Sequence, residues 1–354
     1  MLDTLNTING YVWGLPLIIL VLGTGILLTV RLGLIQVMKL PMALKLIFSA
    51  ESDGEGDVNS FKALCTALAA TVGTGNIVGV ATALKAGGPG ALFWMWLAAF
   101  FGMATKYAEC LLAVKFRKVD ENGNIAGGPM HYIEMGLGQN FKFLAILFAI
   151  FGIGSACLGV GTFAQINSIV EITQIAAGIP TSYTGIALTI LVAVITIGGI
   201  KSIANVSEMV VPTMAGIYFV CTLGIIGTHQ LPNAISMVID GAFNPTAAAG
   251  GFLGSSVMLA MRSGIARGIF SNESGLGSAP IVAAAAKTKW SAEQGLVSMT
   301  GTFIDTIIIC TLTGLSLIVT GVWCGDVNGA AMTSQAFSST YSNVGPILLM
   351  IGLS

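Results

Sequence analysis

Residues 69–79 read Ala-Ala-Thr-Val-Gly-Thr-Gly-Asn-Ile-Val-Gly and lie in the middle of an apolar segment long enough to cross a membrane. Two glycines one residue apart, flanked by threonine and asparagine, weaken a helix at a depth where water cannot replace its hydrogen bonds. Interrupted backbone at that depth is tolerated only where protein buries it or where it borders a cavity. Free N–H and C=O groups at such a break hold small charged solutes or bare cations in membrane carriers. The stretch therefore favours a carrier.

The composition of the whole chain is that of an integral membrane protein. Of 354 residues, 55% are hydrophobic and 9% are charged, against about 25% charged in ordinary globular domains. Because roughly 20 apolar residues cross the hydrocarbon, the sequence predicts eight complete spans and a ninth that begins near Val344 and reaches Ser354. The eight predicted spans are 11–30, 61–84, 91–114, 143–175, 183–200, 206–227, 251–286 and 296–323.

Lysine and arginine gather in alternate loops, with Lys85 as the exception. Since cytoplasmic loops carry the excess of these residues, we expect an outside N-terminus in a multi-pass protein of the cell (inner or plasma) membrane. The first apolar run lacks a basic leader and is interpreted as a retained span. The loops expected in the cytoplasm are 31–60, 115–142, 201–205 and 287–294, and those without lysine or arginine are 176–182, 228–250 and 324–343.

A second glycine-broken polar stretch lies four spans further on, where residues 262–280 read RSGIARGIFSNESGLGSAP. The predicted topology gives the two broken spans opposite directions, which is the inverted-repeat design of many carriers. The alternative for either stretch is close helix packing through small residues. The sequence thus predicts one carrier domain over 1–354: an extra span and loop (1–60), a first five-span repeat (61–227) and a second repeat (251–354). A full copy of the first repeat starting at 251 would run past Ser354, so the second repeat is expected to be incomplete.

The break itself predicts a binding site. It should expose the carbonyls of Ala69, Thr71 and Val72, which suit a hard cation such as Na⁺, and the amides of Thr74 and Gly75 at the N-terminus of a half-helix. That positive helix end suits a carboxylate.

Other polar side chains near the first break are candidates for the same site. The Asn76 amide oxygen and the hydroxyls of Thr71 and Thr74 are possible ion ligands. Gln165 lies deep in the fourth predicted span, where its amide must find a partner. It either donates to a substrate carboxylate or makes an interhelical hydrogen bond.

Charged residues inside the spans are functional candidates by default. Asp305 is the deepest acid of the eighth span; it serves an ion or proton step, or it forms a structural pair with Arg262 or Arg267. Glu273 lies beside the second break and is a candidate for the inner gate.

Two other charged residues, together with the cysteines, receive structural interpretations. Lys106 and Glu109, spaced i,i+3, predict an ion pair on a helix surface. The six cysteines have no metal-ligand spacing, so we expect no cofactor and no metal other than Na⁺ as coupling ion.

At these motifs the chain resembles the alanine or glycine:cation symporter family, also called the sodium:alanine symporters. The resemblance covers the whole chain and is strongest in the last of its motifs. The motifs are TVGTGNIVG (71–79), GGPGA (87–91), GGPMHY (127–132), Q-x-NS (165–168) and RGIFSNESGLGSAP (267–280). It implies an all-α, leucine-transporter-like inverted-repeat bundle with eleven spans, one of them an extra N-terminal span. Family members continue past Ser354, so the resemblance also implies a C-terminally truncated chain.

The resemblance also implies roles for individual residues. The substrate carboxylate would contact Thr74, Gly75 and Gln165. The second broken helix, around 264–271, would form the other wall with Gly264, Gly268 and Ser271. One Na⁺ would use the carbonyls of Ala69 and Val72, and a second would use Thr71 and Asn76.

The leading hypothesis is therefore a secondary transporter that takes up alanine or glycine with Na⁺ by alternating access, and not an enzyme. The partners are then the amino acid, Na⁺ and the lipid bilayer, without nucleic acid. The alternatives are an H⁺-coupled carrier, a non-transporting truncated product, a channel, and a membrane enzyme using Asp305 with Glu273. A channel favours polar rings around an axis, which the sequence lacks, and no paired catalytic motif supports an enzyme.

Overall fold

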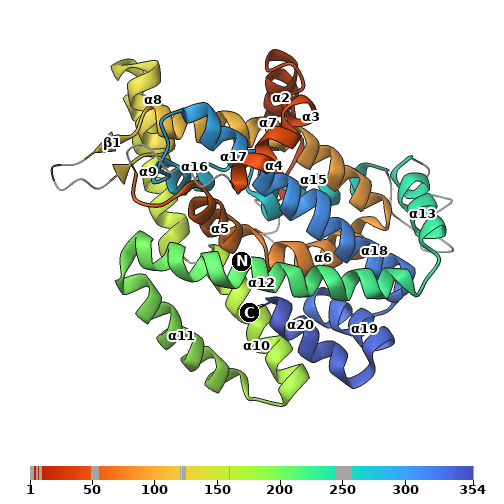
Figure 1. The fold of residues 1–354 in the computed structure, drawn as a ribbon. Coiled ribbons are helices and arrows are strands. Elements are labelled where there is room, and N and C mark those ends of the chain that lie inside the picture. Colours follow the sequence, from red (N-terminus) through yellow and green to blue (C-terminus); the bar gives the residue numbers. More distant parts are fainter. Residues whose placement is uncertain are drawn as a thin grey trace.

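The chain folds into a bundle of helices with one short antiparallel ribbon (Figure 1). The computed structural model describes residues 10–48, 56–119, 121, 125–158, 160–243 and 257–353, together with Thr4 and Thr7. The elements up to the ribbon are α2 (Leu15–Arg31), α3 (Ile35–Met38), α4 (Leu40–Ile47), α5 (Ser60–Thr71), η1 (Gly75–Gly79), α6 (Val80–Gly87), α7 (Gly90–Lys115), β1 (Lys118–Val119) and β2 (Ile125–Ala126).

The remaining elements follow the ribbon. They are α8 (Pro129–Leu137), η2 (Gln139–Phe141), α9 (Lys142–Cys157), α10 (Val160–Ala177), α11 (Thr181–Ile197), α12 (Gly199–Gly227), α13 (Leu231–Phe243), α15 (Val257–Asn272), α16 (Ser278–Ala284), α17 (Ser291–Thr302), η3 (Phe303–Cys310), α18 (Thr311–Val319), η4 (Val322–Cys324), α19 (Gly329–Tyr341), η5 (Ser342–Val344) and α20 (Gly345–Leu353).

Long apolar helices confirm a multi-pass membrane protein. Within the described residues five helices are long and apolar enough to cross a membrane, and α5 with η1 and α6 forms a sixth span bent by 47°. These six correspond to predicted spans 11–30, 61–84, 91–114, 143–175, 206–227 and 296–323. The five long helices are Gly10–Arg31, Gly90–Lys115, Gln139–Ala177, Gly199–Gly227 and Ser291–Val319.

Two predicted spans differ from the structure. The fifth, 183–200, corresponds to α11, an apolar helix of 17 residues. The seventh, 251–286, is divided into α15 and α16 by a turn, and its residues 251–256 lie outside the described residues.

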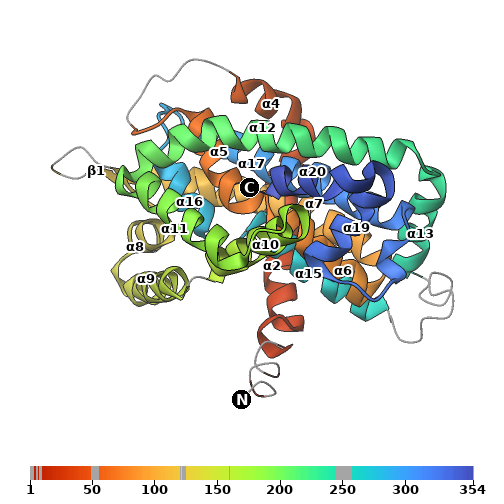
Figure 2. The same cartoon turned by 90° about the horizontal axis from the view of Figure 1, so that it is seen from below.

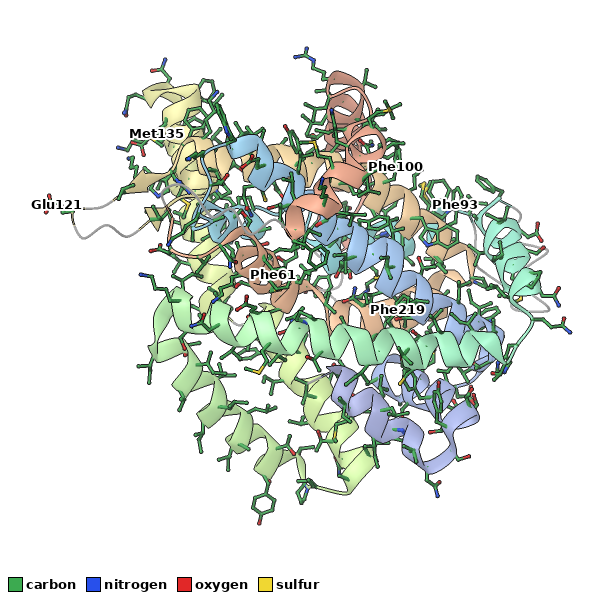
Figure 3. The ribbon with its side chains drawn as sticks, viewed as in Figure 1. Phe61, Phe93, Phe100, Glu121, Met135 and Phe219 are labelled. Carbon is green, nitrogen blue, oxygen red and sulfur yellow. The ribbon has the colours of Figure 1, made fainter. Side chains whose placement is uncertain are left out.

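The outer faces of the bundle carry large apolar side chains. Phe151 on α9 is 70% exposed, Ile197 at the end of α11 is 85% exposed and Phe219 on α12 is 39% exposed; Figure 3 shows Phe219 with the other side chains. Such surfaces would be unfavourable in water, whereas lipid tails accept them. Figure 1 shows α12 crossing the molecule with α10, α11, α19 and α20 along one side.

The interior is organised around α7, which packs against both α15 and α17. Met95 and Ala99 of α7 are 0% exposed. Small residues allow the close approach, as is usual between membrane helices: a Cβ at Gly295 of α17 would lie 2.9 Å from the Tyr107 carbonyl oxygen of α7. In Figure 2, α2 passes beside this core and extends beyond the bundle.

The segment before α5 and the segment after α16 are joined by backbone hydrogen bonds. The Asp57 and Val58 amides donate to the Ala285 carbonyl at 2.8 and 3.2 Å, and the Lys287 amide donates to the Val58 carbonyl at 2.7 Å. Val58 and Ala286 form an isolated parallel bridge. The entrance to the first broken span is therefore tied to the exit from the second.

Arg117 closes this junction from the loop after α7. Its Nη1 donates to the carbonyl oxygens of Ala284 and Ala286 at 2.9 and 2.7 Å. We call the set of residues 57–58, Arg117 and 284–287 the latch.

Charged side chains from α12 join the same region. Lys62 Nζ lies 3.2 Å from a Glu208 carboxylate oxygen and donates to Asn205 Oδ1 at 2.7 Å, while Lys201 Nζ lies 3.8 Å from Asp57 Oδ1. Residues from loops 31–60, 115–142, 201–205 and 287–294 thus meet at one place. The lysine and arginine pattern assigned these loops to one side of the membrane, and their contacts agree with a common side.

Loosening the latch is expected to expose Cys65, which lies one turn beyond Lys62 in α5 and is 1% exposed. In a background with the exposed Cys157 and Cys324 changed to serine, Arg117→Ala should raise the rate of Cys65 alkylation by a membrane-permeant maleimide about tenfold. The reason is that a hydrogen bond from a charged donor contributes about 1.5–3 kcal/mol.

The matched control is Lys118→Ala, which removes a neighbouring exposed positive charge. An unchanged alkylation rate in Arg117→Ala, or an equal increase in both variants, would contradict the latch.

Candidate functional site

The first broken helix is interrupted where the sequence predicts. Helix α5 ends at Thr71, Val72 is extended with φ −77° and ψ 111°, and the π-helical turn η1 begins at Gly75. The Gln165 amide of α10 donates to the Ala70 carbonyl at 3.1 Å, so this half-exposed glutamine finds its partner at the break. The hydroxyl of Thr71 contacts the Leu68 carbonyl of its own helix at 3.5 Å.

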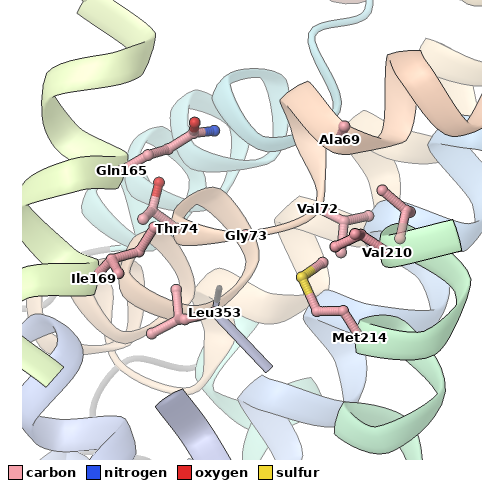
Figure 4. Close-up of a pocket in the computed structure, with 10 residues that line it drawn as sticks. Ala69, Val72, Gly73, Thr74, Gln165, Ile169, Val210, Met214 and Leu353 are labelled. Carbon is pink, nitrogen blue, oxygen red and sulfur yellow. The ribbon is translucent and has the colours of Figure 1, made fainter. Parts of the chain in front are cut away.

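A cavity of about 130 Å³ lies against this break. Figure 4 shows Thr74 and Gln165 on one side and the apolar Val72, Val210 and Met214 on the other. Pockets for drug-sized ligands measure about 300–1,000 Å³, so this one suits a much smaller solute. It is lined by Ala69, Val72, Gly73, Thr74, Gln165, Ile169, Val210, Val211, Met214 and Leu353.

A polar cluster lies deeper, around Asp305 of the π-helical segment η3. The Asp305 side chain is 0% exposed. It accepts hydrogen bonds from Asn76 Nδ2 at 2.8 Å, from Ser271 Oγ at 2.9 Å and from Thr306 Oγ1 at 2.8 Å. The cluster therefore joins η1, α15 and η3. π-Helical turns are rare and occur frequently at functional sites.

Asn76 connects this cluster to the break. Its Oδ1 accepts the Gly73 N–H at 2.8 Å, and its Nδ2 also donates to the Asp305 carbonyl at 2.9 Å. Since Gly73 lines the cavity, one asparagine bridges the cavity wall and the buried carboxylate.

The predicted arginine partners of Asp305 lie elsewhere. Arg262 donates to the Gly10 carbonyl at 2.7 Å, and the Arg267 guanidinium lies 5.9 Å from the Phe270 ring centre. In the part of the chain that the structure describes, the carboxylate has no lysine, arginine or histidine nitrogen within 4.0 Å. The interpretation of an Asp305–arginine pair was wrong because serine, threonine and asparagine satisfy the carboxylate.

The second break falls later than the sequence predicts. Helix α15 is continuous from Val257 to Asn272, and the interruption follows at Glu273, Gly275 and Gly277, whose φ angles are 55°, 86° and 81°. Glu273 accepts a hydrogen bond from the Ser278 hydroxyl. The expectation of a broken helix around 264–271 is corrected to a turn over 273–277.

Glycines 264 and 268 serve close packing on α7. A Cβ at Gly264 would lie 2.2 Å from the Ala91 carbonyl oxygen, and one at Gly268 would lie 3.4 Å from the Met95 Cα. At Gly264 and Gly268 the structure therefore agrees with the alternative interpretation of the motif, close helix packing through small residues.

Gly75 also lies at a helix contact. A Cβ there would lie 3.0 Å from the Ser271 Cα, so η1 and α15 touch beside the Asp305 cluster. Of the predicted site residues, Ala69, Val72, Thr74 and Gln165 border the cavity, whereas Asn76 and Ser271 join the Asp305 cluster.

Sequence reasoning missed two members of the cluster. Asn272 Nδ2 donates to Thr306 Oγ1 at 3.1 Å, and Asn272 Oδ1 accepts the Ser274 N–H at 2.9 Å. Thr306 stands beside Asp305 in an otherwise apolar run, a polar pair that marks a buried site. Asn272 lies in the Ser-Asn-Glu-Ser sequence of the second motif.

Apolar spans, a broken span beside a small cavity and a buried carboxylate between helices define a multi-pass membrane protein of the carrier class. The sequence matches the model of the sodium:alanine symporter family over residues 1–354, and the chain belongs to that family.

Individual relatives agree with this assignment. An uncharacterized transporter of Haemophilus influenzae is 56% identical over 99% of this chain and 77% of its own length. The sodium/alanine symporter AgcS of Methanococcus maripaludis is 48% identical over 98% of this chain and 78% of its own length. A putative sodium/proton-dependent alanine carrier, YrbD of Bacillus subtilis, is 41% identical over 91% of this chain and 65% of its own length.

The packing role of Gly264 predicts that Gly264→Ala lowers stability by about 1–3 kcal/mol, as overpacked cores do. Thermal unfolding in detergent should show a clearly lower Tm, because α15 and α7 must separate to admit the methyl group. Gly216→Ala on α12, with open space around the added Cβ, should leave the Tm unchanged. Equal Tm values for both variants would contradict the packing assignment.

Proposed function

We propose that this chain takes up alanine or glycine together with Na⁺ by alternating access, with its N-terminus outside the cell. The observation that carries the proposal is the small cavity at the break of a membrane helix, joined through Asn76 to the buried Asp305 carboxylate. The 48% identity to a protein named a sodium/alanine symporter supports it. The two breaks support an inverted repeat of the leucine-transporter type as the framework.

The substrate is assigned to the cavity. A carboxylate is attracted to the N-terminal end of a half-helix, and the half-helix that starts at Thr74 borders the cavity beside Gln165. The apolar wall of Val72, Val210 and Met214 suits a side chain no larger than a methyl group. A volume of about 130 Å³ favours the smallest amino acids.

The coupling cation is assigned to the Asp305 cluster, with the carbonyls near Ala69 and Val72 as a second place for a cation. A carboxylate buried without a positive partner is costly, so a bound cation would stabilise it strongly. Hard cations such as Na⁺ prefer carboxylate, carbonyl and hydroxyl oxygens, and the cluster supplies such oxygens from Asp305, Ser271 and Thr306.

The latch supports the alternating-access part of the proposal. It closes one end of both broken spans in the structure, on the side that the lysine and arginine pattern assigns to the cytoplasm. Release to that side would then require the bonds between residues 57–58 and 284–287 to open.

Transport of labelled alanine into proteoliposomes tests the proposal. Uptake should need an inward Na⁺ gradient, should fall to background when K⁺ replaces Na⁺, and should compete with unlabelled glycine. Uptake that persists after a sodium ionophore collapses the gradient would contradict Na⁺ coupling. A proton gradient that drives uptake in Na⁺-free buffer would favour the H⁺-coupled alternative.

Asp305→Asn keeps the shape of the side chain and removes its charge. We expect the KM for Na⁺ to rise at least tenfold or uptake to vanish, since a unit charge at close range contributes about 4 kcal/mol even at an effective dielectric constant of about 20. Asp326→Asn, at an exposed position, is the matched control and should transport normally. An unchanged KM for Na⁺ in Asp305→Asn would exclude this carboxylate as the cation site.

A further inference from the structure

Two charged residues of α7, Lys106 and Glu109, lie in the interior of the bundle. Their side chains are 5% and 8% exposed, and Lys106 Nζ lies 3.9 Å from Glu109 Oε1. The sequence interpretation of a helix-surface pair was wrong, because both side chains are buried in the bundle interior. Spacing along one helix does not show which face its neighbours bury.

This pair is poorly suited to stabilising the fold. Within the described residues, neither Lys106 Nζ nor Glu109 Oε1 has a hydrogen-bond partner, and 3.9 Å is longer than a hydrogen bond. Removing two charges from water costs more free energy than the attraction in such a loose pair supplies. For this reason apolar replacements of buried pairs are often neutral or stabilising. Ionisable groups inside a membrane span are instead functional candidates.

The surroundings of the pair connect it to the second break. The turn over 273–277 packs against this part of α7, because a Cβ at Gly275 would lie 3.6 Å from Thr105 Cγ2. One turn earlier on α7, a Cβ at Gly102 would lie 3.1 Å from Ser274. Helix α7 therefore carries its two charges along the side that faces this turn.

The pair also acts on the Asp305 cluster. A Cβ at Gly102, one turn before Lys106, would lie 3.8 Å from Asn272 Oδ1 of the cluster, and η3, which carries Asp305, packs against α7. The Lys106 ammonium is more than 4.0 Å from the Asp305 carboxylate and attracts it as a charge through the apolar interior, without a hydrogen bond. Lys106, Glu109 and Asp305 together bring one positive and two negative charges into the apolar interior. One additional monovalent cation would make this group neutral.

We propose that Lys106 and Glu109 are positioning residues that set the affinity of the Asp305 cluster for its coupling cation. This inference rests on the proposed function. Lys106 weakens cation binding by partly compensating Asp305, and Glu109 strengthens it by holding and partly neutralising Lys106. The loose geometry fits this balance, because in the described part of the chain the Lys106 ammonium donates no hydrogen bond to a fixed acceptor and acts on both carboxylates only through its charge.

The decisive property is the sign of the effect, which differs between the two residues. Lys106→Met removes a positive charge at similar side-chain length and should lower the KM for Na⁺ about fivefold. Glu109→Gln removes a negative charge at nearly the same side-chain shape, and it should raise the KM for Na⁺ about fivefold. Charges act over many ångströms in a medium of low dielectric constant. The double variant should return to within about twofold of the parent protein.

The measurement is Na⁺-dependent alanine uptake in proteoliposomes, with the KM for Na⁺ and the KM for alanine determined separately and the Tm recorded for each variant. A purely structural pair would lower the Tm in both single variants and would shift the KM for Na⁺ in one direction or not at all; either result overturns the inference. If Lys106→Met cannot be recovered folded, Lys106→Arg should keep the KM for Na⁺ within about twofold while Glu109→Gln still raises it.

The two proposals fail in different ways. Uptake by the parent protein without any dependence on Na⁺ overturns the proposed function and this inference together. Normal Na⁺ dependence in the parent protein, with no opposed shifts in the variants, overturns the inference alone.

Discussion

The interior of this bundle is dominated by one electrostatic constraint, a carboxylate at a depth where a charge is expensive. Asp305 is fully buried and is held by neutral donors from η1, α15 and its own π-helical segment. Hydrogen bonds from neutral groups lower the cost of the charge without cancelling it. The polar cluster, the interrupted helices and the charged pair on α7 lie around this group, and the proposed transport function gives each of them a role in relation to it.

Much of this arrangement was readable from the sequence, and the limits have a physical cause. The first break was predicted because Gly73 and Gly75 flank a threonine in the middle of a span, and the structure confirms it. Gly264 and Gly268 lie in a similar glycine-rich stretch of a span, yet they pack against α7 within a continuous helix. A small residue in an apolar segment either interrupts a helix or lets another helix approach, and the partner decides which. The partner is absent from the local sequence.

Burial was the other property that the sequence did not reveal. Lys106 and Glu109 have the spacing of an ordinary surface pair, but both are buried in the bundle interior. Asp305 was recognised as a deep acid, whereas its real partners are the neighbouring Thr306 and two residues from elements far away in the chain, Asn76 and Ser271. Local pattern therefore predicted the chemistry of these residues, and tertiary packing determined which of them meet.

The position of Asn76 offers a physical route from ion to substrate. Its amide group donates to Asp305 and accepts the N–H of Gly73, so both ends of one rigid, planar group are fixed. A cation that draws Asp305 toward itself must change the first bond, and the planar amide transmits that change to the backbone that lines the cavity. Conversely, a solute seated against Gly73 and Thr74 favours one orientation of the amide. Under the proposed function, coupling would need no long pathway, because one side chain is bonded both to the proposed cation site at Asp305 and to Gly73 in the cavity wall.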